Sequence, residues 1–560
     1  MLAPNVFIVD YAQVARKSLG GLTKLALVAV LLACTTGCMT GIREYFRNGC
    51  EVGPDYCKPA VPVESEWIDS RDERLSTEPP DLSSWWTVFD DPCLNECIRI
   101  AYSENITLRE AGFRIMEARA LRRVAAGNLF PQSQEATGSY TRTQLSSESG
   151  FGGIGLGGGQ IDIWQVGGQL AWELDFWGRF RRAVEAADAN LDATVEAYDD
   201  VLVILLGDVA ATYVEIRTLQ QRIDYAERNA ESLKGSLRIA TDQFEVGRAG
   251  KLDVAQAQTN YSQTVALVPQ FQAQLRQAQN RLCVLLGRPP EDLTTLLSMS
   301  PARIPQAEPD VIVGIPAELI RRRPDIRQAE RLVARQSAYI GVAEADLYPA
   351  FSITGNLGYQ APTFARLFRS SAFTGSVSPG FNWNILNYGR IRNGVIAEQA
   401  LFQQYVAQYQ NRVLEAQREA EDAIVAFLRS QEEAEAYRTS ASAAVEASSL
   451  VQQQFEGGIT DFNRVFVAES TLVTQQDALA VAEGKVASSL VDVYRALGGG
   501  WEIRLTQPVG FQGVPVALPQ PQPEPVQQPE PVDESPEAIP ALPSEAREES
   551  LLDLPAFAIE

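Results

Sequence analysis

A long internal repeat constrains this chain more than any other feature of its sequence. Residues 172–181 read WELDFWGRFR and residues 383–392 read WNILNYGRIR, so the two segments begin 211 positions apart (383 − 172). The same offset relates Phe244 to Phe455 and Leu286 to Leu497. A repeat of this length predicts a fold built from two similar halves.

Each half begins with a helical pattern, over about 93–127 in the first half and about 316–346 in the second. Both patterns end at a leucine, an aromatic residue and a proline, at 129–131 and 347–349, which lie 218 positions apart (347 − 129). Proline disfavours helix at the residue before it, so both helices should end there. The change of offset from 218 to 211 places a length difference in a loop between the two signatures.

Alternating apolar and polar residues follow each proline. The alternation is clear over 164–176, 351–359 and 377–385, and weaker over 133–144. A period of two predicts β-strands with one apolar and one polar face. We therefore predict β-hairpins at about 131–177 and about 350–388, the first closed by the glycine-rich loop 150–159.

Strands of about ten residues with one apolar face and aromatic residues near their ends fit strands that cross an outer membrane. A soluble sandwich is the alternative. Two hairpins supply four strands, which are too few to close a barrel, and an open sheet edge is not viable in lipid. Membrane strands would require several chains to share one barrel, and three copies would supply twelve strands (3 × 4).

Long helical patterns follow both hairpins, over about 178–246 and about 389–455. Their apolar residues recur at steps of three and four, which is typical of coiled coils. Each pattern ends at a glycine-containing turn, at 246–253 and 457–464, and a second helix returns to Leu286 or Leu497. We predict long coiled-coil helices over about 178–287 and about 389–498.

The N-terminus reads as a targeting signal. Arg16, Lys17 and Lys24 precede an apolar stretch at 25–33 that is too short to span a bilayer. Cys34 and Cys38 follow small residues at its end, which resembles a bacterial lipoprotein signal with a lipid-modified cysteine. The sequence leaves open which cysteine is modified, and an ordinary signal peptide is the alternative. Neither cysteine is followed by Asp, which favours the outer membrane in that class.

The charge balance excludes one class of partner. The chain has 48 Lys and Arg against 71 Asp and Glu, which opposes binding to nucleic acid. Ten acids and one Arg lie within residues 519–560, interleaved with proline. Such a segment cannot bury a core, so we predict a disordered acidic tail over 506–560.

Neither a metal nor a catalytic site is predicted. The chain has no histidine, which nearly excludes the usual zinc and copper sites. Cys93 and Cys97 are one helical turn apart and are expected to be buried small residues, whereas Cys50 and Cys57 could form a loop disulfide. Carboxylates are spread along helices, and we expect no catalytic residue and no cofactor.

Five motifs occur in a fixed order between about 52 and 501. They are VGPDY at 52–56, AWELDFWGR at 171–179, LDVAQAQ at 252–258, RRPDIRQAE at 322–330 and GITDFNRV at 458–465. In these motifs the chain resembles the TolC-like outer-membrane efflux proteins, in their lipoprotein branch. The resemblance implies a mainly α fold with β: two repeats of helix, β-hairpin, long helix, turn and helix. It further implies a trimeric twelve-stranded outer-membrane β-barrel continued by a periplasmic α-helical barrel.

The expected layout is a lipoprotein signal peptide at 1–37, an extended segment at 38–90, the repeats at 91–300 and 301–505, and the tail at 506–560. The resemblance implies a homotrimer in outer-membrane lipid that works with a periplasmic adaptor and an inner-membrane transporter. It would passively conduct drugs or other small solutes out of the cell. The exit duct of a type I protein secretion system is the alternative, and a lipid-anchored coiled-coil rod is the alternative from a different class.

In this family the two helical turns form a periplasmic aperture, which implicates Asp253, Asp461 and Arg464. Asp253 with Gln256 equally reads as a capping box, and Asp461 or Asn463 could cap the last helix. The second turn often carries Asp where this chain has Val467, which favours Asp253 as the aperture residue. A structural salt-bridge cluster is expected at Arg321, Arg322, Arg323 and Asp325.

Overall fold

The computed structural model describes residues 41–76, 78, 82–144, 160–306, 311–312, 316 and 322–506. The chain divides into two compact units, Met1–Pro508 and Val509–Glu560. The second unit, the predicted signal peptide with Cys34 and Cys38, and the glycine-rich loop at 150–159 lie outside the described residues.

Two long helices have equal lengths. Helices α5 (Arg179–Glu245) and α10 (Arg390–Glu456) contain 67 residues each, and the return helices α6 (Lys251–Leu285) and α11 (Phe462–Ala496) contain 35 each. Both long helices start after a glycine in the left-handed region, Gly178 at φ +83° and Gly389 at φ +82°. Glycine adopts this conformation without steric cost, which explains the glycine in each copy of the repeated motif.

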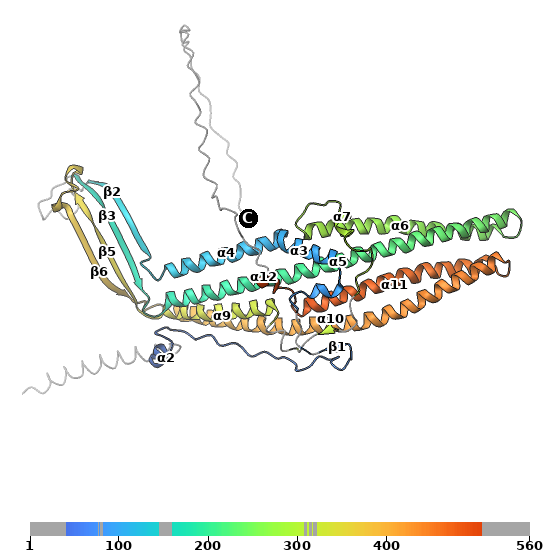
Figure 1. Ribbon diagram of the computed structural model, residues 1–560. Coiled ribbons are helices and arrows are strands. Elements are labelled where there is room, and N and C mark those ends of the chain that lie inside the picture. Colours follow the sequence, from blue (N-terminus) through green and yellow to red (C-terminus); the bar gives the residue numbers. More distant parts are fainter. Residues whose placement is uncertain are drawn as a thin grey trace, which may run out of the picture. The chain divides into compact units, whose positions relative to one another are not determined.

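A shorter helix lies end to end with each return helix, α4 (Ile106–Gly127) with α6 and α9 (Pro324–Ala345) with α11 (Figure 1). The residue that precedes each short helix bonds to the last carbonyl of the return helix. Asn105 Nδ2 donates to the Leu285 carbonyl at 2.8 Å, and Arg323 Nη1 donates to the Ala496 carbonyl at 2.8 Å. These positions are related by the repeat offsets, 218 (323 − 105) and 211 (496 − 285), so the two copies are joined in the same way.

Helix α5 is central in the bundle. It packs against α4 and α6 of its own repeat and against α9 and α11 of the second repeat, while α10 packs against α9 and α11. The apolar steps of three and four are the reason: Leu202, Leu206, Val209, Tyr213 and Ile216 of α5 are all buried. No helix among the described residues combines the length and the apolar character needed to cross a membrane.

The two hairpins form one antiparallel sheet with the order β2-β3-β5-β6. The strands are β2 (Ser133–Gln144), β3 (Gln160–Leu174), β5 (Ala350–Ala361) and β6 (Phe373–Asn382). Two short 3-10 helices, η3 (Phe364–Arg366) and η4 (Ser370–Ala372), lie between β5 and β6. Among the described residues β2 and β6 are paired on one side only, so the sheet has two open edges.

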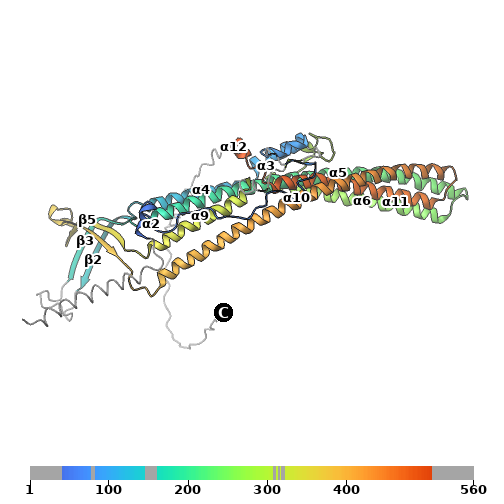
Figure 2. The same ribbon diagram turned by 90° about the horizontal axis from the view of Figure 1, so that it is seen from below.

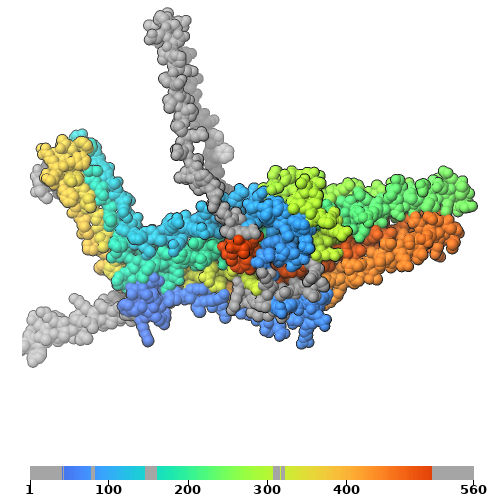
Figure 3. Space-filling view, in the orientation of Figure 1, coloured from blue at the N-terminus to red at the C-terminus, as the bar shows by residue number. Residues whose placement is uncertain are grey.

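An N-terminal segment lies along the second repeat. Helix α2 (Ile42–Arg47) is followed by residues 48–74, here called the strap, which run beside α9 and α10 (Figures 2 and 3). Gln410 of α10 donates to the Ala60 carbonyl at 3.2 Å, and the Ile68 N–H donates to Glu421 at 3.0 Å. The strap ends at β1 (Leu75–Ser76), which pairs in parallel with β4 (Val311–Ile312).

The remaining elements are short. They are η1 (Trp85–Phe89), α3 (Pro92–Glu104), α7 (Thr294–Leu297) and α12 (Ile503–Thr506). The helical stretch predicted over about 93–127 consists of two helices, because the chain breaks between α3 and α4. Asn105 has an extended backbone at ψ 129°, and its side chain accepts the Leu108 N–H at 2.8 Å, so it starts a new helix.

The cysteines behave differently in the two predicted pairs. Cys93 and Cys97 are fully buried, as expected from their spacing on α3. The possible disulfide between Cys50 and Cys57 is not formed, since both are free thiols. After a bend at Gly53 no turn brings the chain back, and an extended stretch keeps such cysteines farther apart than the roughly 4.4–6.8 Å between Cα atoms that a disulfide requires.

Candidate functional site

One face of the sheet is apolar across β3, β5 and β6, and Tyr140 of β2 adds to it. The register aligns the apolar positions of neighbouring strands, for example Trp172 opposite Ile353 and Phe351 opposite Phe381. The face is formed by Tyr140, Trp164, Val166, Leu170, Trp172, Leu174, Phe351, Ile353, Leu357, Tyr359, Phe373, Val377 and Phe381. Val377 is 77% exposed and Phe381 69% exposed, so this surface lacks a covering layer within the described chain. An exposed apolar patch of this extent marks contact with a membrane or another protein.

The opposite face is polar. It carries Gln165, Gln169, Ser352, Thr354, Asn356, Thr374, Ser376, Ser378 and Asn382. Neighbouring side chains on it bond across the strands, as between Ser376 and Asn356. A sheet that is apolar on one side and polar on the other suits lipid outside and water inside a barrel.

Aromatic rings gather at both ends of the strands. At the end next to the helices, Phe351 lies 5.4 Å from Phe176 and 6.1 Å from Phe381 between ring centroids. At the far end, Tyr359 lies 5.8 Å from Phe373, and further pairs join Trp164, Phe364 and Phe368. Two aromatic bands separated by an apolar band are typical of strands that cross an outer membrane.

The repeated tryptophan connects each strand to its short helix. The Trp172 indole N–H donates to the Leu129 carbonyl at 3.3 Å, and the Trp383 indole N–H donates to the Leu347 carbonyl at 2.9 Å. Leu129 and Leu347 belong to the Leu-aromatic-Pro signatures that end the two short helices. The sequence signal of the repeat therefore corresponds to one hydrogen bond made twice.

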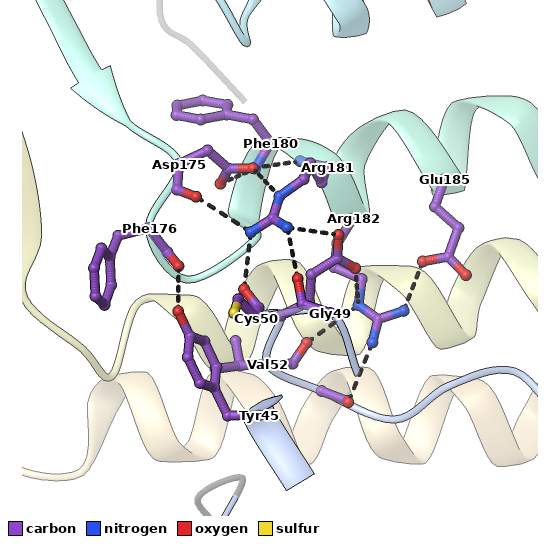
Figure 4. Close-up of polar contacts among 12 residues, drawn as sticks. Tyr45, Gly49, Cys50, Val52, Asp175, Phe176, Phe180, Arg181, Arg182 and Glu185 are labelled. Atoms are coloured by element: carbon purple, nitrogen blue, oxygen red, sulfur yellow. Dashed lines mark hydrogen bonds and ion pairs between the residues drawn. The ribbon is translucent and has the colours of Figure 1, made fainter. Parts of the chain in front are cut away.

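In the first repeat the turn from sheet to helix is held by Asp175 (Figure 4). Its carboxylate accepts the backbone N–H groups of Phe180 at 2.9 Å and Arg181 at 3.0 Å, and it also accepts the Arg181 Nε–H at 3.0 Å. The first N–H groups of a helix have no partner within the helix, so this carboxylate satisfies the start of α5. The direction in which α5 leaves the sheet is thereby set.

Arg182 holds the strap at this junction. Its side chain is almost fully buried and donates to the Val52 carbonyl at 3.2 Å and to Glu185 at 2.7 Å (Figure 4). It also donates to Asp55 at 2.8 Å. Gly53 approaches α9 so closely that a Cβ atom on it would lie 2.4 Å from the Gly341 Cα. These contacts explain the VGPDY motif, whose valine carbonyl, glycine and aspartate are all used. The motif is visible in the sequence, but Arg182 was not predicted as its partner.

The two helical turns lie together at the opposite end of the helices from the sheet (Figure 1). A buried cluster joins all four helices there: Ala240 of α5, Ala257 of α6, Phe455 of α10, and Phe462 and Val465 of α11. We call this region the tip. Its packing brings the residues proposed for an aperture onto one end of the molecule.

Asp253 is the third residue of α6, and its Oδ2 accepts the Gly250 N–H at 2.7 Å. The capping box read from Asp253 to Gln256 is therefore wrong, because α6 begins at Lys251 and Gly250 is the N-cap. Asp461 is the N-cap of α11 and accepts the Arg464 N–H at 3.2 Å. Arg464 is exposed, as is Val467.

Glu469 is a buried carboxylic acid near the tip that was not predicted from the sequence. It is only 4% exposed, and Ser236 of α5 donates a hydrogen bond to it across the contact between the two repeats. Burial raises the pKa of Glu469 to about 7, and the bond from Ser236 opposes that rise only in part. Glu469 lies at helical spacing from the buried Phe462 and Val465, so it falls on the apolar face of α11. This spacing was the feature of the sequence from which its burial could have been predicted.

Of the predicted salt-bridge cluster, Arg323 and Asp325 pair at the start of α9. Arg323 donates to Asp325 at 3.1 and 2.8 Å and to Glu419 at 2.6 Å, and Arg412 lies 2.7 Å from Asp325. Burial opposes ionisation of Asp325, but the hydrogen bonds and charge of Arg323 outweigh it and hold its pKa below the usual value. Arg321 lies outside the described residues. The described chain contains no group of three or more Asp, Glu, Cys or His residues placed to hold a metal ion.

Solved structures of outer-membrane channels share this fold. The chain is 32% identical to the outer-membrane channel OprN, with a TM-score of 0.76 over 80% of this chain and 99% of that chain. It is 25% identical to the open state of the MtrE outer membrane channel of Neisseria gonorrhoeae, with a TM-score of 0.70 over 81% of this chain and 99% of that one. The two-faced sheet on paired helical hairpins is thus the fold of an outer-membrane channel subunit.

Sequence relatives agree. The chain is 31% identical over 467 residues to the toluene efflux pump outer membrane protein TtgI of Pseudomonas putida, which covers 81% of this chain and 96% of the relative. It is 30% identical over 456 residues to Nodulation protein T of Rhizobium leguminosarum bv. viciae, covering 81% and 91%. The family model described as "Outer membrane efflux protein" matches residues 97–288 and 315–499.

The chain belongs to the outer membrane efflux protein family. The two matched segments coincide with the two structural repeats, so the duplication is a property of the family fold. These findings confirm the family, the fold class, the outer-membrane location with a periplasmic extension, and the role as an efflux channel that the sequence predicted.

Proposed function

We propose that three copies of this chain form one exit duct, which passively conducts small solutes from a periplasmic pump assembly across the outer membrane. The observation that carries the proposal is the four-stranded sheet with one apolar face and two open edges. Unpaired backbone groups cannot remain in lipid. Pairing of β6 in one copy with β2 in the next would satisfy both edges, and three copies would close a barrel of twelve strands (3 × 4).

The lipid anchor would sit next to the membrane end of the helices. We propose Cys38 or Cys34 as the lipidated residue, and α2 begins only four residues after Cys38 (42 − 38). The Tyr45 hydroxyl donates to the Phe176 carbonyl at 2.8 Å, which fixes α2 at the junction of sheet and helices. A short tether from this position reaches the inner surface of the outer membrane. Replacing both cysteines with Ser should abolish acyl labelling, and labelling that persists would contradict the assignment.

The tip would form the periplasmic aperture, lined by Asp253, Asp461 and Arg464. Three copies of Asp253 around a narrow axis would favour cations, since like charges several Å apart repel by about 1 kcal/mol or more at the surface of a protein. Asp253→Asn keeps an acceptor for the Gly250 N–H while removing the charge. It should reduce cation selectivity in a planar bilayer with no fall in melting temperature. Unchanged selectivity with lower stability would make Asp253 a helix cap only.

A periplasmic adaptor and an inner-membrane transporter would complete the pump. The relative named for toluene efflux supports small organic solutes as cargo. A passive duct requires no catalytic group, so the energy for transport would come from the inner-membrane partner. The alternative, an exit duct for secreted protein, would be favoured by copurification with a protein-secreting transporter.

The trimer is tested by chemical crosslinking of the full-length protein in its native membrane. Crosslinked species should stop at three chains, because a closed barrel has no free edge to add a fourth. A ladder that stops at two, or that continues past three, would contradict this arrangement. A stable uncrosslinked monomer would contradict it as well.

A further inference from the structure

A charged cavity of about 410 Å³ lies where α9 meets α11. Its walls come from α5, α10, the end of α11 and Arg323 at the start of α9. Apolar side chains, including Val203 and Ile204 of α5 and Ala426 of α10, form part of the lining beside the charged groups. Cavities of roughly 300–1,000 Å³ with apolar walls and a few placed polar groups are the usual form of small-molecule sites.

The cavity opens away from the strap. On α10, Gln417 and Glu421 bond to the strap, whereas Glu419 and Ala423 line the cavity. A step of two residues turns an α-helix by about 200°, so the strap and the cavity lie on opposite faces of α10. The inference rests on the proposed function, in which the strap covers the outside of the tunnel and the cavity therefore faces the bore.

Every arginine in the cavity already has a carboxylate partner. Arg323 and Arg412 bond to Asp325 as described above, Arg418 lies 2.9 Å from Asp422, and Arg495 lies 3.4 Å from Asp208. An anionic ligand would have to displace one of these carboxylates. The arrangement therefore disfavours anions.

Two carboxylates that line the cavity are not paired with an arginine. Asp200 of α5 and Asp492 of α11 both line the cavity, and neither makes a hydrogen bond or an ion pair within the described chain. Asp200 is half-buried and Asp492 is exposed at the cavity rim. A carboxylate withdrawn from water without a partner is unfavourable, so the charged Asp200 would be stabilised by any cation that enters.

We propose that this cavity is a transit site for organic cations, in which Asp200 and Asp492 bind ammonium groups and the apolar wall contacts the carbon chain. An amine presents N–H donors to the two free carboxylates without disturbing the arginine pairs. The site lies in the middle of the helical wall and is separate from the tip with Asp253. Three chains would place three copies around the bore.

Binding should depend on pH. Burial raises the pKa of Asp200 to about 6. Of the charged groups that face it, Asp325 and Glu419 raise the pKa further, whereas Arg412 and Arg323 lower it. Asp492 and Arg495 lie on the cavity wall contributed by α11. Ammonium binding requires the ionised carboxylate, so affinity should rise as the pH increases through about 6 and level off above it.

The test is block of single-channel current by hexane-1,6-diamine, with the full-length protein in a planar bilayer. We expect Asp200→Asn to raise the half-blocking concentration about ten-fold, the factor that corresponds to one charge-assisted hydrogen bond of about 1.4 kcal/mol. Asp492→Asn should raise it less, because its carboxylate is exposed. The matched control is Glu421→Gln, which removes a carboxylate from the strap side of α10 and keeps an acceptor for the Ile68 N–H.

Three outcomes would overturn the proposal. They are equal block in wild type and both aspartate variants, an equal loss of block in Glu421→Gln, and loss of block in Asp253→Asn alone, which would place the probe at the tip. If Asp200→Asn fails to assemble, Asp492→Asn and the pH dependence of wild-type block still decide the question. Absence of conductance without the probe would contradict the proposed function, whereas normal conductance with unselective block would contradict this site only.

Discussion

The two repeats meet their return helices through equivalent atoms but with different chemistry. In the first repeat a neutral amide, Asn105, bonds to the last carbonyl of α6. In the second repeat a guanidinium, Arg323, makes the equivalent bond to α11 and is surrounded by Asp325, Glu419 and Arg412. Backbone geometry is thus shared by the copies. The bonding side chain belongs to a buried ionic cluster in the second copy, whereas the first has the more exposed pair of Arg288 and Glu104 beside Asn105.

The junctions between sheet and helix differ in the same manner. Arg182 of the first repeat corresponds to Asn393 (182 + 211), which is exposed and whose side chain, within the described residues, bonds only to the Gly389 carbonyl at 2.9 Å. Trp177 donates to the Pro349 carbonyl at 2.8 Å, whereas its counterpart Tyr388 is 99% exposed. Each repeat has a junction between sheet and helix, but there is only one strap in the described chain, and it covers the junction of the first repeat. The uncovered junction is the surface expected to meet a neighbouring copy.

The return helices show a third difference. Glu469 of α11 is buried against α5, whereas the equivalent residue of α6, Gln258 (469 − 211), is exposed and bonds to Ser262 at 2.8 Å. Helix α11 lies between α5 and α10, whereas α6 packs mainly along α5 and meets α11 over a smaller contact. A duplicated sequence therefore keeps its backbone where hydrogen bonds along the chain decide it, and diverges where neighbours differ.

The largest expected difference in stability between the repeats is where each short helix meets its return helix, α4 with α6 and α9 with α11. Arg323→Ala would leave the buried Asp325 with Arg412 alone, and loss of one partner of a buried pair costs about 3–5 kcal/mol. Asn105→Ala removes a helix cap and one hydrogen bond, for about 1–2 kcal/mol. Melting temperatures of the detergent-solubilised protein should fall more for Arg323→Ala. Equal falls in melting temperature would mean that the ionic cluster adds no stability beyond the hydrogen bond that both repeats share.

The second expected difference is a dependence of stability on pH, caused by the buried Glu469 near the tip. Because the pKa of Glu469 is raised from 4.5 to about 7 in the folded protein, the folded state holds this proton more tightly than the unfolded state does. The stabilisation of the folded state by this proton is complete below about pH 4.5 and is lost as the pH rises to about 7. The free energy of unfolding should fall by about 3 kcal/mol over this range.

Glu469→Gln should remove this dependence while keeping an acceptor for Ser236. The measurement is the melting temperature of wild type and variant between pH 4.5 and 8. Gln258→Glu is the matched control, since it adds the same acid at the exposed position of the other repeat and should leave the wild-type profile unchanged. If the melting temperatures of wild type and Glu469→Gln change with pH in parallel, burial of Glu469 is not the cause of the pH dependence of stability.

The smallest effect is expected at the sheet junctions. Arg182→Ala would free the Val52 carbonyl and release the strap. Of its three carboxylate partners, Asp55 and Glu185 are exposed enough to be solvated and Glu51 is half-buried, so we expect about 2 kcal/mol. Asn393→Ala should change stability by less than about 0.5 kcal/mol. Limited proteolysis should cleave the strap faster in Arg182→Ala only. Equal cleavage in both variants would show that Arg182 does not anchor the strap.

Much of the fold follows from repeated local patterns. Helix and strand positions were predictable because proline, glycine and apolar spacing act within a few residues, as at Gly178 and Gly389. The duplicated tryptophan also gave the correct pairing of the halves. Asp461 was among the predicted caps of the last helix for the same reason.

Contacts between distant segments were less predictable. The break at Asn105 depends on the end of α6, which lies 180 residues away (285 − 105). Arg182 acquires its role only when the strap reaches it, and the free carboxylates Asp200 and Asp492 share a cavity only because α5 and α11 pack together. Spacing along the sequence carries no record of such neighbours, although the position of Glu469 on an apolar helix face was a usable clue.

The central claim is that copies of this chain close a water-filled pore with the apolar face of the sheet toward lipid. The most direct test is single-channel recording of the purified full-length protein in a planar lipid bilayer. The account predicts discrete conductance steps of uniform size that are carried mainly by cations. Absence of any conductance from protein that is folded and inserted in the bilayer would contradict it.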